Sequence, residues 1–319
     1  MPGKHIPVLL DEVLQHLQPK AGAHYIDCTV GGGGHAKRIL EATAPGGRLL
    51  AIDLDSEALK ISRERLRRFG NRATFVQGSF ANLKQIYDEQ FSLHKVYGIL
   101  LDLGISSIEL EGEDRGFSFR VNAALDMRFD SRQELTAATV VNTWPFEKIE
   151  KVIREYGQEP LAHEITKNIL NARQTHPIIK TKTLVEAILP AFRNKLKTKK
   201  EVPWIGGTHP ATRTFQALRI AVNGELDSLE RVLPQAVDLL VPGGMLCVLT
   251  FHSLEDRIVK RFFRELSRDC ICPPELPVCR CGHRARVRLV TRRGVAPTRE
   301  EMERNPRSRS AHLRTVQKL

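Results

Sequence analysis

Residues 29–36 read T-V-G-G-G-G-H-A, with four consecutive glycines between an apolar run and the beginning of a helical pattern. Glycine loses more backbone entropy on folding than any other residue, so a run of four is costly for a segment that only has to fold. The run therefore indicates that something must approach this backbone closely. In doubly wound α/β proteins, a glycine-rich loop between a strand and a helix binds ligands at the carboxyl end of the sheet.

The sequence around this loop predicts a parallel sheet. Short apolar runs rich in β-branched residues recur at a regular interval, at 24–28, 48–53, 73–78 and 96–102. Helical patterns fill the gaps, for example 57–69, with Ser56 placed to cap it. This alternation is typical of βαβ units and of a sheet covered on both faces. The expected fold class is α/β, with a Rossmann-like, mostly parallel sheet.

The regular alternation stops after the fourth predicted strand. The next strong strand is 245–251, after a Pro-Gly-Gly turn, and the amphipathic pattern at 211–240 is long enough to be its crossover helix. Residues 110–205 are mostly helical in pattern: Pro145 opens one helix, and Thr183 with Glu186 forms a capping box for another. We therefore expect an inserted all-helical domain at 110–205 within a discontinuous α/β domain at 1–109 and 206–319.

Two classes of cofactor fit the glycine loop. Gly31, Gly33 and Ala36 satisfy the dinucleotide-binding pattern, with Asp53 about 20 residues further on. S-adenosylmethionine is held by a similar loop, with an acid at the end of the second strand on the ribose. Asp102, at the end of the fourth strand, favours this second class, because a carboxylate suits a sulfonium cation better than a pyrophosphate.

The charge of the chain points to a polyanionic partner. Its formal net charge is +12, and residues 260–319 hold 16 Lys and Arg against 6 Asp and Glu. A basic region of this kind favours nucleic acid. No apolar run approaches the roughly 18 residues that a membrane span needs, and the N-terminus lacks the pattern of a signal peptide. The expected compartment is therefore the cytoplasm, without a membrane partner.

Several longer blocks resemble one family, the bacterial 16S rRNA cytosine-N4 methyltransferases. These blocks are DCTVGGGGHA, AIDLD, GILLDLGISS, RGFSF (115–119), LDMRFD (125–130), HPATRTFQALRIAVNGEL (209–226), FHSLEDRIVKRF (251–262) and NPRSRSAHLR (305–314). The resemblance implies a class I S-adenosylmethionine-dependent methyltransferase with a helical insert for substrate recognition. It also implies methylation of the exocyclic N4 of a cytidine in the decoding centre of 16S rRNA within the 30S subunit.

Two other functions stay open from the residues alone: an NAD-dependent oxidoreductase and a non-catalytic ribosome-assembly factor that binds RNA. The oligomeric state is also open, and a homodimer is one option.

The resemblance also implies site residues. The cofactor positions are Gly33, Gly34, His35, Asp53, Phe80, Asp102 and Glu109. The family has Pro-Gln where this chain has Ile108-Glu109, and glutamate cannot donate a hydrogen bond as an amide can. Asp102 is the expected catalytic residue, as a hydrogen-bond acceptor for the target amine.

Two loops allow two interpretations each. Phe117 and Phe119, within 115–119, could stack a flipped base or could simply pack in the protein. His252 could contact RNA or could be a hydrogen-bonded structural histidine. The neighbouring Ser253 and Asp256 are expected to form a capping box for the next helix.

Four of the six cysteines form a C-x-C-x6-C-x-C pattern: Cys270, Cys272, Cys279 and Cys281. In a reducing compartment such a cluster suggests zinc rather than disulfides. The C-x-C spacing is tighter than the usual zinc pattern, so the sequence does not decide whether the cluster binds a metal. The arginines around it, at 280, 284, 286 and 288, favour an rRNA contact. Cys28 and Cys247 are expected to be buried thiols.

Overall fold

The structure is a computed structural model that describes residues 6–106, 115–198, 209–273, 275–276 and 278–319. The chain divides into two compact units, one formed by Met1–Ser106 with Leu226–Leu319 and the other by Ser107–Glu225. The division resembles the expected insertion, but its second boundary lies at 225/226 rather than 205/206.

The first unit is built on a seven-stranded sheet with the order β3-β2-β1-β4-β5-β7-β6. Strands β1 to β5 are parallel, whereas β7 runs antiparallel to both β5 and β6. The strands are β1 (His24–Asp27), β2 (Leu49–Asp53), β3 (Ala73–Gln77), β4 (Val96–Asp102), β5 (Leu240–Thr250), β6 (Val287–Leu289) and β7 (His312–Lys318). The chain order reverses between β1 and β4, which is where sheets of this type bind ligands.

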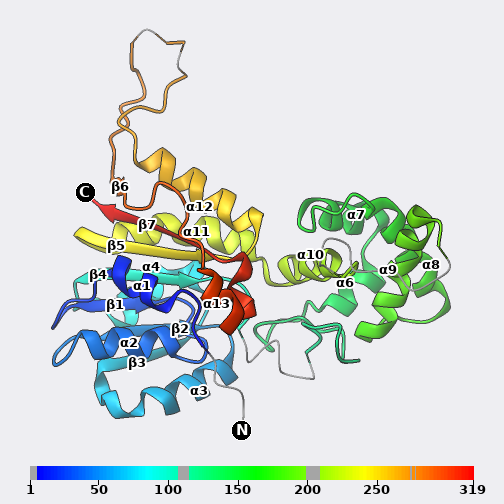
Figure 1. Ribbon diagram of the computed structural model, residues 1–319, viewed down its shortest axis with the longest axis horizontal. Coiled ribbons are helices and arrows are strands. Elements are labelled where there is room, and N and C mark those ends of the chain that lie inside the picture. Colours follow the sequence, from blue (N-terminus) through cyan, green and yellow to red (C-terminus); the bar gives the residue numbers. More distant parts are fainter. Residues whose placement is uncertain (1–5, 107–114, 199–208, 274, 277) are drawn as a thin grey trace. The chain divides into compact units, whose positions relative to one another are not determined.

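Helices cover both faces of this sheet, and each face has its own apolar core (Figure 1). One core is formed with α1 (Leu10–Leu17), α2 (Gly34–Ala42) and α3 (Ser56–Leu66). The other is formed with α4 (Leu83–Gln90), α11 (Glu225–Leu239) and α12 (Ser253–Leu266). The interiors of β2 and β4 are almost fully buried, which explains why these strands have continuous apolar sequences rather than alternating ones.

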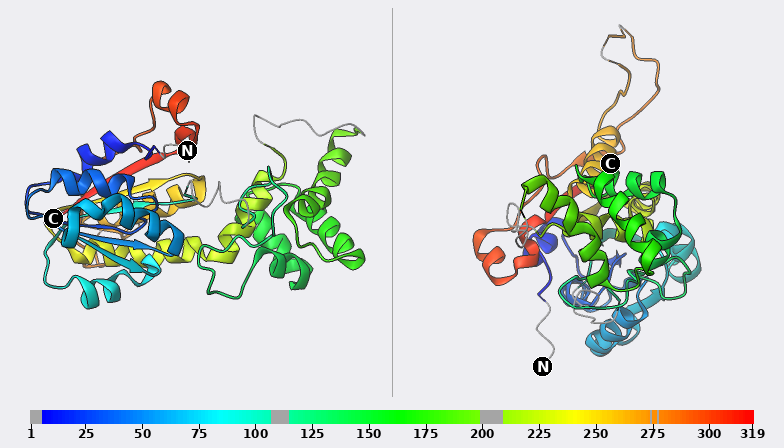
Figure 2. Two further views of the ribbon diagram at one scale, coloured as in Figure 1. Left: turned by 90° about the horizontal axis from the view of Figure 1, so that it is seen from below. Right: turned by 90° about the vertical axis from the view of Figure 1, so that its right-hand side faces the viewer.

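The second unit is helical, as Figure 2 shows in green. Its helices are α6 (Ala137–Thr143), α7 (Phe146–Glu155), α8 (Ala162–Thr175), α9 (Thr181–Leu196) and α10 (Thr212–Asn223). Pro145 caps the start of α7, where the sequence predicts a helix to begin. The face of α7 that carries Ile149, Val152 and Ile153 is buried, as its spacing indicates.

The predicted crossover helix at 211–240 is wrong in one respect, because the structure has two helices there. Gly224 adopts a left-handed conformation with φ of 58° and ends α10, a conformation that glycine accepts without strain. Helix α10 lies against α6 and α7 in the second unit, whereas α11 packs in the first. The break therefore explains the later boundary between the units.

Two predicted helix caps are displaced along the chain. The side chain of Asp55, not of Ser56, caps α3 by accepting from the backbone N–H of Glu57. Helix α9 begins at Thr181 after Lys180, so the predicted cap Thr183 lies inside its first turn. The first error arises because Asp55 and Ser56 are adjacent and both fit the capping pattern. The second arises because the N-cap of α9 is Lys180, whose side chain forms no cap.

The last part of the chain contributes a strand to the sheet, which the sequence analysis did not predict. Strand β7 inserts between β5 and β6. Helix α13 (Arg299–Arg304) and the turn after it hold the N-terminal segment: Glu301 Oε1 accepts from the backbone N–H of Leu9 at 2.7 Å, and Asn305 Nδ2 donates to Ile6 O at 3.1 Å. Segments from the two ends of the chain are therefore joined within one unit.

Among the helices of the described residues, none has both the length and the apolar character that crossing a bilayer requires.

Candidate functional site

Three aspartates gather at the carboxyl edge of the sheet. Asp27, Asp53 and Asp102 are the last residues of β1, β2 and β4, which are neighbours in the sheet. Asp27 is 1% exposed. The side chain of Asp102 keeps 23% of its surface exposed, yet its Oδ1 atom is buried. The carboxyl groups are therefore largely shielded from bulk water, while part of the Asp102 side chain remains accessible to a ligand.

Burial raises the pKa of all three carboxyl groups. Desolvation is the main cause in each case, and it raises the pKa of Asp27 to about 7 and that of Asp53 to about 6. The pKa of Asp102 lies well above its ordinary range, through desolvation and through the charges of Asp27 and Glu255. Each group holds its negative charge at a cost, which a nearby cation would reduce.

The glycine loop is tied to the second of these acids. The backbone N–H of Gly31 donates to Asp53 Oδ2 at 2.8 Å, and that of Asp55 donates to Oδ1 at 2.9 Å. Each carboxylate oxygen has two lone pairs, so Asp53 can accept further hydrogen bonds.

The reason for glycine differs between positions of the loop. A Cβ on Gly34 would lie 2.3 Å from Pro7 Cγ, and one on Gly33 would lie 3.3 Å from Ser62 Cβ. At Gly34 the protein's own packing requires glycine, whereas at Gly33 the left-handed φ of +75° favours it. The N–H of Gly33 donates to Val30 O at 2.7 Å, so this group is already used within the loop. Gly31 has φ of +49° and nothing nearer than 3.9 Å to its Cβ position. The space beside the main chain is therefore open at Gly31.

Helix α2 begins directly after this loop with Gly33 as its N-cap. It has no side-chain cap, and its first turn carries no acidic residue. The first N–H groups of a helix have no partner within the helix and form the positive end of its dipole. The loop thus presents hydrogen-bond donors close to the acids.

His35 and Thr29 position Asp102. His35 Nε2 lies 3.0 Å from Val8 O, so this nitrogen donates, and Nδ1 lies 3.5 Å from Asp102 Oδ2. The backbone N–H of Asp102 donates to Thr29 Oγ1 at 2.7 Å. Within the described residues, the buried Oδ1 atom of Asp102 has no hydrogen-bond partner. A buried acceptor of this kind is costly unless a ligand supplies the donor.

Phe80 lies beside the second acid along the sheet edge. The backbone N–H of Gly78 donates to Asp53 O at 2.9 Å, and Ser79 Oγ accepts from the N–H of Ala81 at 3.2 Å. These bonds turn the chain after β3, and Phe80 is left half-buried against the core. Its role as a cofactor contact stays a prediction. Glu109, the remaining predicted site residue, lies outside the described residues.

Sequence reasoning missed Glu255, which is 2% exposed. It forms a capping box with His252 at the start of α12 and accepts from the N–H of Phe251 at 2.8 Å. The predicted box of Ser253 and Asp256 is wrong by one residue, because histidine is not among the usual capping residues. The arrangement favours the structural interpretation of His252.

Phe117 and Phe119 serve packing in the second unit. Phe117 is 6% exposed and stacks on Phe129 at 5.4 Å between ring centroids. Phe119 stacks on His209 at 4.5 Å and meets Phe215 edge-on. A base could not stack on Phe117 without displacing Phe129, so the structure favours packing over base stacking.

The buried acids predict how stability changes with pH. A carboxyl group whose pKa is higher in the folded state favours folding at low pH, and this advantage is lost as the pH rises through the folded value. For Asp27 the window runs from about 4, the ordinary value, to about 7. In Asp27→Asn, Asn Oδ1 can still accept from the Thr29 N–H that Asp27 holds. This variant should gain stability relative to the parent chain between pH 5 and pH 7.5, by roughly 1.4 kcal/mol for each pKa unit removed.

Urea unfolding of both proteins at the two pH values measures this effect. Asp88→Asn is the matched control, because Asp88 lies exposed on α4, paired only with Lys84. An equal pH dependence in the parent chain and Asp27→Asn would contradict the prediction.

Comparison with known proteins extends over almost the whole chain. A family model, that of the MraW methylase family, matches residues 3–319. A protein of Pelobacter propionicus is 49% identical over 317 residues, and one of Heliobacterium mobile is 46% identical over 315 residues; each alignment covers 99% of both chains. A protein of Symbiobacterium thermophilum is 48% identical over 99% of this chain and 96% of its own. All three are named ribosomal RNA small subunit methyltransferase H.

Proposed function

The chain belongs to the MraW methylase family, and from this premise we propose that it methylates the exocyclic N4 of a cytidine in the decoding centre of 16S rRNA. Family membership makes it an S-adenosylmethionine-dependent methyltransferase. The names of its relatives support small-subunit rRNA as the substrate. The choice of cytidine N4 rests on the sequence motifs and on the chemistry of the site.

This proposal rests mainly on the set of buried acids, together with the Oδ1 atom of Asp102, for which the described residues supply no hydrogen-bond donor. S-adenosylmethionine, when bound, supplies an electrophilic methyl group on a sulfonium cation. Asp27 and Asp102 favour a bound cation, since a positive charge reduces the cost of their burial. The same acids would repel the pyrophosphate of a nicotinamide dinucleotide, which argues against the oxidoreductase alternative.

The remaining parts of the cofactor match the other groups of the site. Asp53 would accept hydrogen bonds from the ribose hydroxyls with its remaining lone pairs. Phe80 would flank the adenine. The N–H groups of Gly34 and His35, at the start of α2, would donate to the carboxylate of the amino-acid tail. The N–H of Gly33 instead donates to Val30 O at 2.7 Å and closes the loop.

Asp102 would act on the target amine. The lone pair of a cytidine N4 is conjugated with the ring, which makes this nitrogen a weak nucleophile. A hydrogen bond from the amine to Asp102 Oδ1 would favour a more pyramidal nitrogen whose lone pair can attack. The raised pKa of Asp102 also suits it to take up the proton that N4 must lose. The rest of the acceleration would come from alignment of the reacting atoms.

The charge of the chain supports an RNA substrate. The surplus of Lys and Arg in residues 260–319 supplies the phosphate contacts that dominate affinity for RNA. We assign substrate recognition to the helical unit as well, and we place the reaction in the cytoplasm on 30S particles.

Transfer of labelled methyl groups to 30S particles tests the function. We expect label in the rRNA and N4-methylcytidine as the only labelled nucleoside after digestion. Duplex DNA in parallel reactions should stay unlabelled. Label in another nucleoside would refute the assignment to cytidine N4. Absence of label, with tight RNA binding, would favour the non-catalytic assembly factor.

A further inference from the structure

The segment between α12 and β6 is a long hairpin that leaves the body of the first unit (Figures 1 and 2). Its base is held by three contacts, two to the end of α12 and one between the two arms of the hairpin. The N–H of Arg286 donates to Leu266 O at 2.8 Å, the N–H of Ala285 donates to Asp269 Oδ1 at 3.1 Å, and His283 Nε2 lies 3.0 Å from Glu265 O.

Beyond this base, the described residues of the hairpin form no apolar core. Its larger apolar side chains are in solvent: Ile271 is 50% exposed, Leu276 48% and Val278 66%. The described residues between 269 and 286 belong to no helix or strand. A segment of this length cannot gain enough from burial to offset its conformational entropy. Another interaction must therefore hold the hairpin in one shape.

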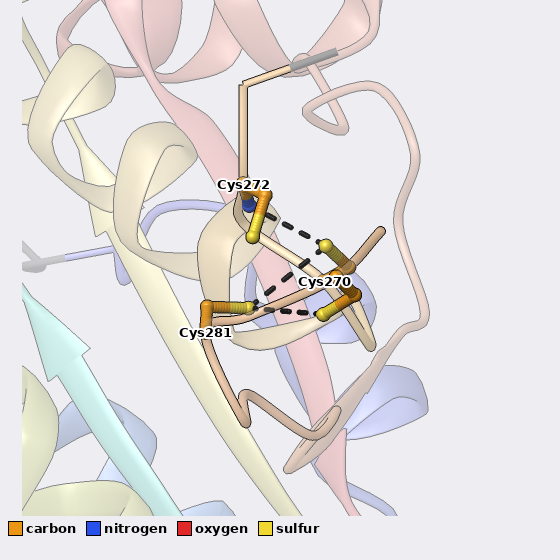
Figure 3. Close-up of side chains that lie close together, drawn as sticks. Cys270, Cys272 and Cys281 are labelled. Carbon is orange, nitrogen blue, oxygen red and sulfur yellow. Dashed lines mark hydrogen bonds between the residues drawn. The ribbon is translucent and has the colours of Figure 1, made fainter. Parts of the chain in front are cut away.

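Four cysteine side chains turn toward one another inside the hairpin. The Sγ atoms of Cys270, Cys272, Cys279 and Cys281 all lie within 4.8 Å of each other. Figure 3 shows Cys270, Cys272 and Cys281 with their sulfur atoms converging. The arrangement thus crosslinks the two arms above the base, where apolar contacts are missing.

The sulfur distances fit a tetrahedral metal. The Sγ atoms of Cys279 and Cys281 are 3.6 Å apart, and those of Cys270 and Cys281 are 3.9 Å apart. Zinc–sulfur bonds of about 2.3 Å place the corners of a tetrahedron about 3.8 Å apart. A disulfide needs about 2.05 Å. The spacing therefore matches four ligands around one ion rather than two disulfides.

The surroundings favour thiolates. The N–H of Cys272 donates to Cys270 Sγ at 3.4 Å, and the N–H of Arg280 donates to Cys272 Sγ at 3.5 Å. Such donors stabilise negative charge on sulfur. Arg280 and Arg284 lie close to these cysteines in the sequence, and their positive charge would offset the negative charge that four thiolates leave around a divalent ion.

We propose that Cys270, Cys272, Cys279 and Cys281 bind one Zn²⁺ ion, which acts as the core of the hairpin. Four ligands complete the coordination of zinc, so the site is structural and takes no part in methyl transfer. The narrow C-x-C spacing does not prevent this, because each C-x-C pair supplies two corners from one arm.

Metal content and a cobalt titration test the proposal on the full chain. The protein purified without chelator should contain one zinc per chain. After zinc removal, Co²⁺ should give the thiolate charge-transfer and strong visible bands of a tetrahedral sulfur site. Both signals should disappear in Cys272→Ser/Cys279→Ser and persist in Cys247→Ala, whose thiol is buried in β5. No zinc, bound iron instead, or no thiolate band in the parent chain would overturn the proposal.

Limited trypsin digestion gives a second measurement, independent of the metal assay. Zinc should protect the bonds after Arg280 and Arg284, and removal of zinc should expose them while the thermal unfolding of the whole chain changes little. Cleavage that is equally fast with and without zinc would refute the structural role. Mass analysis that finds Cys270–Cys281 disulfides in reduced preparations would do the same.

Discussion

Asp102→Asn is expected to lower kcat about 10³-fold at saturating S-adenosylmethionine, the size of effect found when a key hydrogen-bonding or proton-accepting group is removed. The asparagine has nearly the same shape, but one of its two oxygens becomes an NH₂ group that can only donate. Its amide oxygen also cannot take up the proton lost by N4. Single-turnover methyl transfer to 30S particles measures the effect apart from cofactor binding and product release.

Stability separates this loss from unfolding. Because burial of the carboxyl group opposes its charge, the neutral asparagine should leave the unfolding temperature unchanged or higher. Asp88→Asn, on the exposed face of α4, should keep full activity. Turnover of Asp102→Asn near that of the parent chain would remove Asp102 from the mechanism.

Asp53→Asn is expected to weaken S-adenosylmethionine binding about 100-fold, which corresponds to roughly 3 kcal/mol or two hydrogen bonds to a charged group. The carboxylate already accepts from Gly31 and Asp55. In asparagine, an NH₂ group replaces one of these carboxylate oxygens. It would face a backbone N–H donor, and it could not accept a hydrogen bond from a ribose hydroxyl. Calorimetric titration measures the change in Kd.

Binding of S-adenosylhomocysteine, the cofactor product of the reaction, provides the control for Asp53→Asn. S-adenosylhomocysteine has the same ribose but lacks the sulfonium charge. Asp53→Asn should weaken both compounds equally, because the contact is to the ribose. Asp27→Asn removes only negative charge and should weaken S-adenosylmethionine more than S-adenosylhomocysteine. A selective loss of S-adenosylmethionine in Asp53→Asn would contradict the ribose contact.

The sequence predicted the parts of this site that follow from one-dimensional patterns. A strand ending in an acid is visible in the run before Asp53 and in the run before Asp102, and the parallel arrangement brings such ends to one edge. The sequence could not show that Gly34 is required by packing against Pro7, because these residues meet only after the N-terminal segment folds back. Glu255 was also missed, because it is far from Asp102 in the sequence. Its charge raises the pKa of Asp102 only because folding brings the two carboxyl groups close together.

Errors in the fold have similar physical origins. A single glycine at 224 is tolerated inside an amphipathic pattern, and only its left-handed conformation in the structure divides the helix. Strand β7 was overlooked because it contains His312, Arg314 and Gln317 among its apolar residues. Its burial between two strands depends on partners far away in the sequence.

The position of β7 has a consequence for synthesis on the ribosome. The helical unit is one continuous stretch and can fold as soon as it emerges, whereas the sheet gains its β5–β7 pairing only after residues 312–318 are made. A nascent or truncated chain without these residues would expose the unpaired backbone N–H and C=O groups along the edge of β5. Such an edge can pair with another chain and promote aggregation. The order of translation therefore makes the helical unit the first to be complete and the unit with the sheet the last.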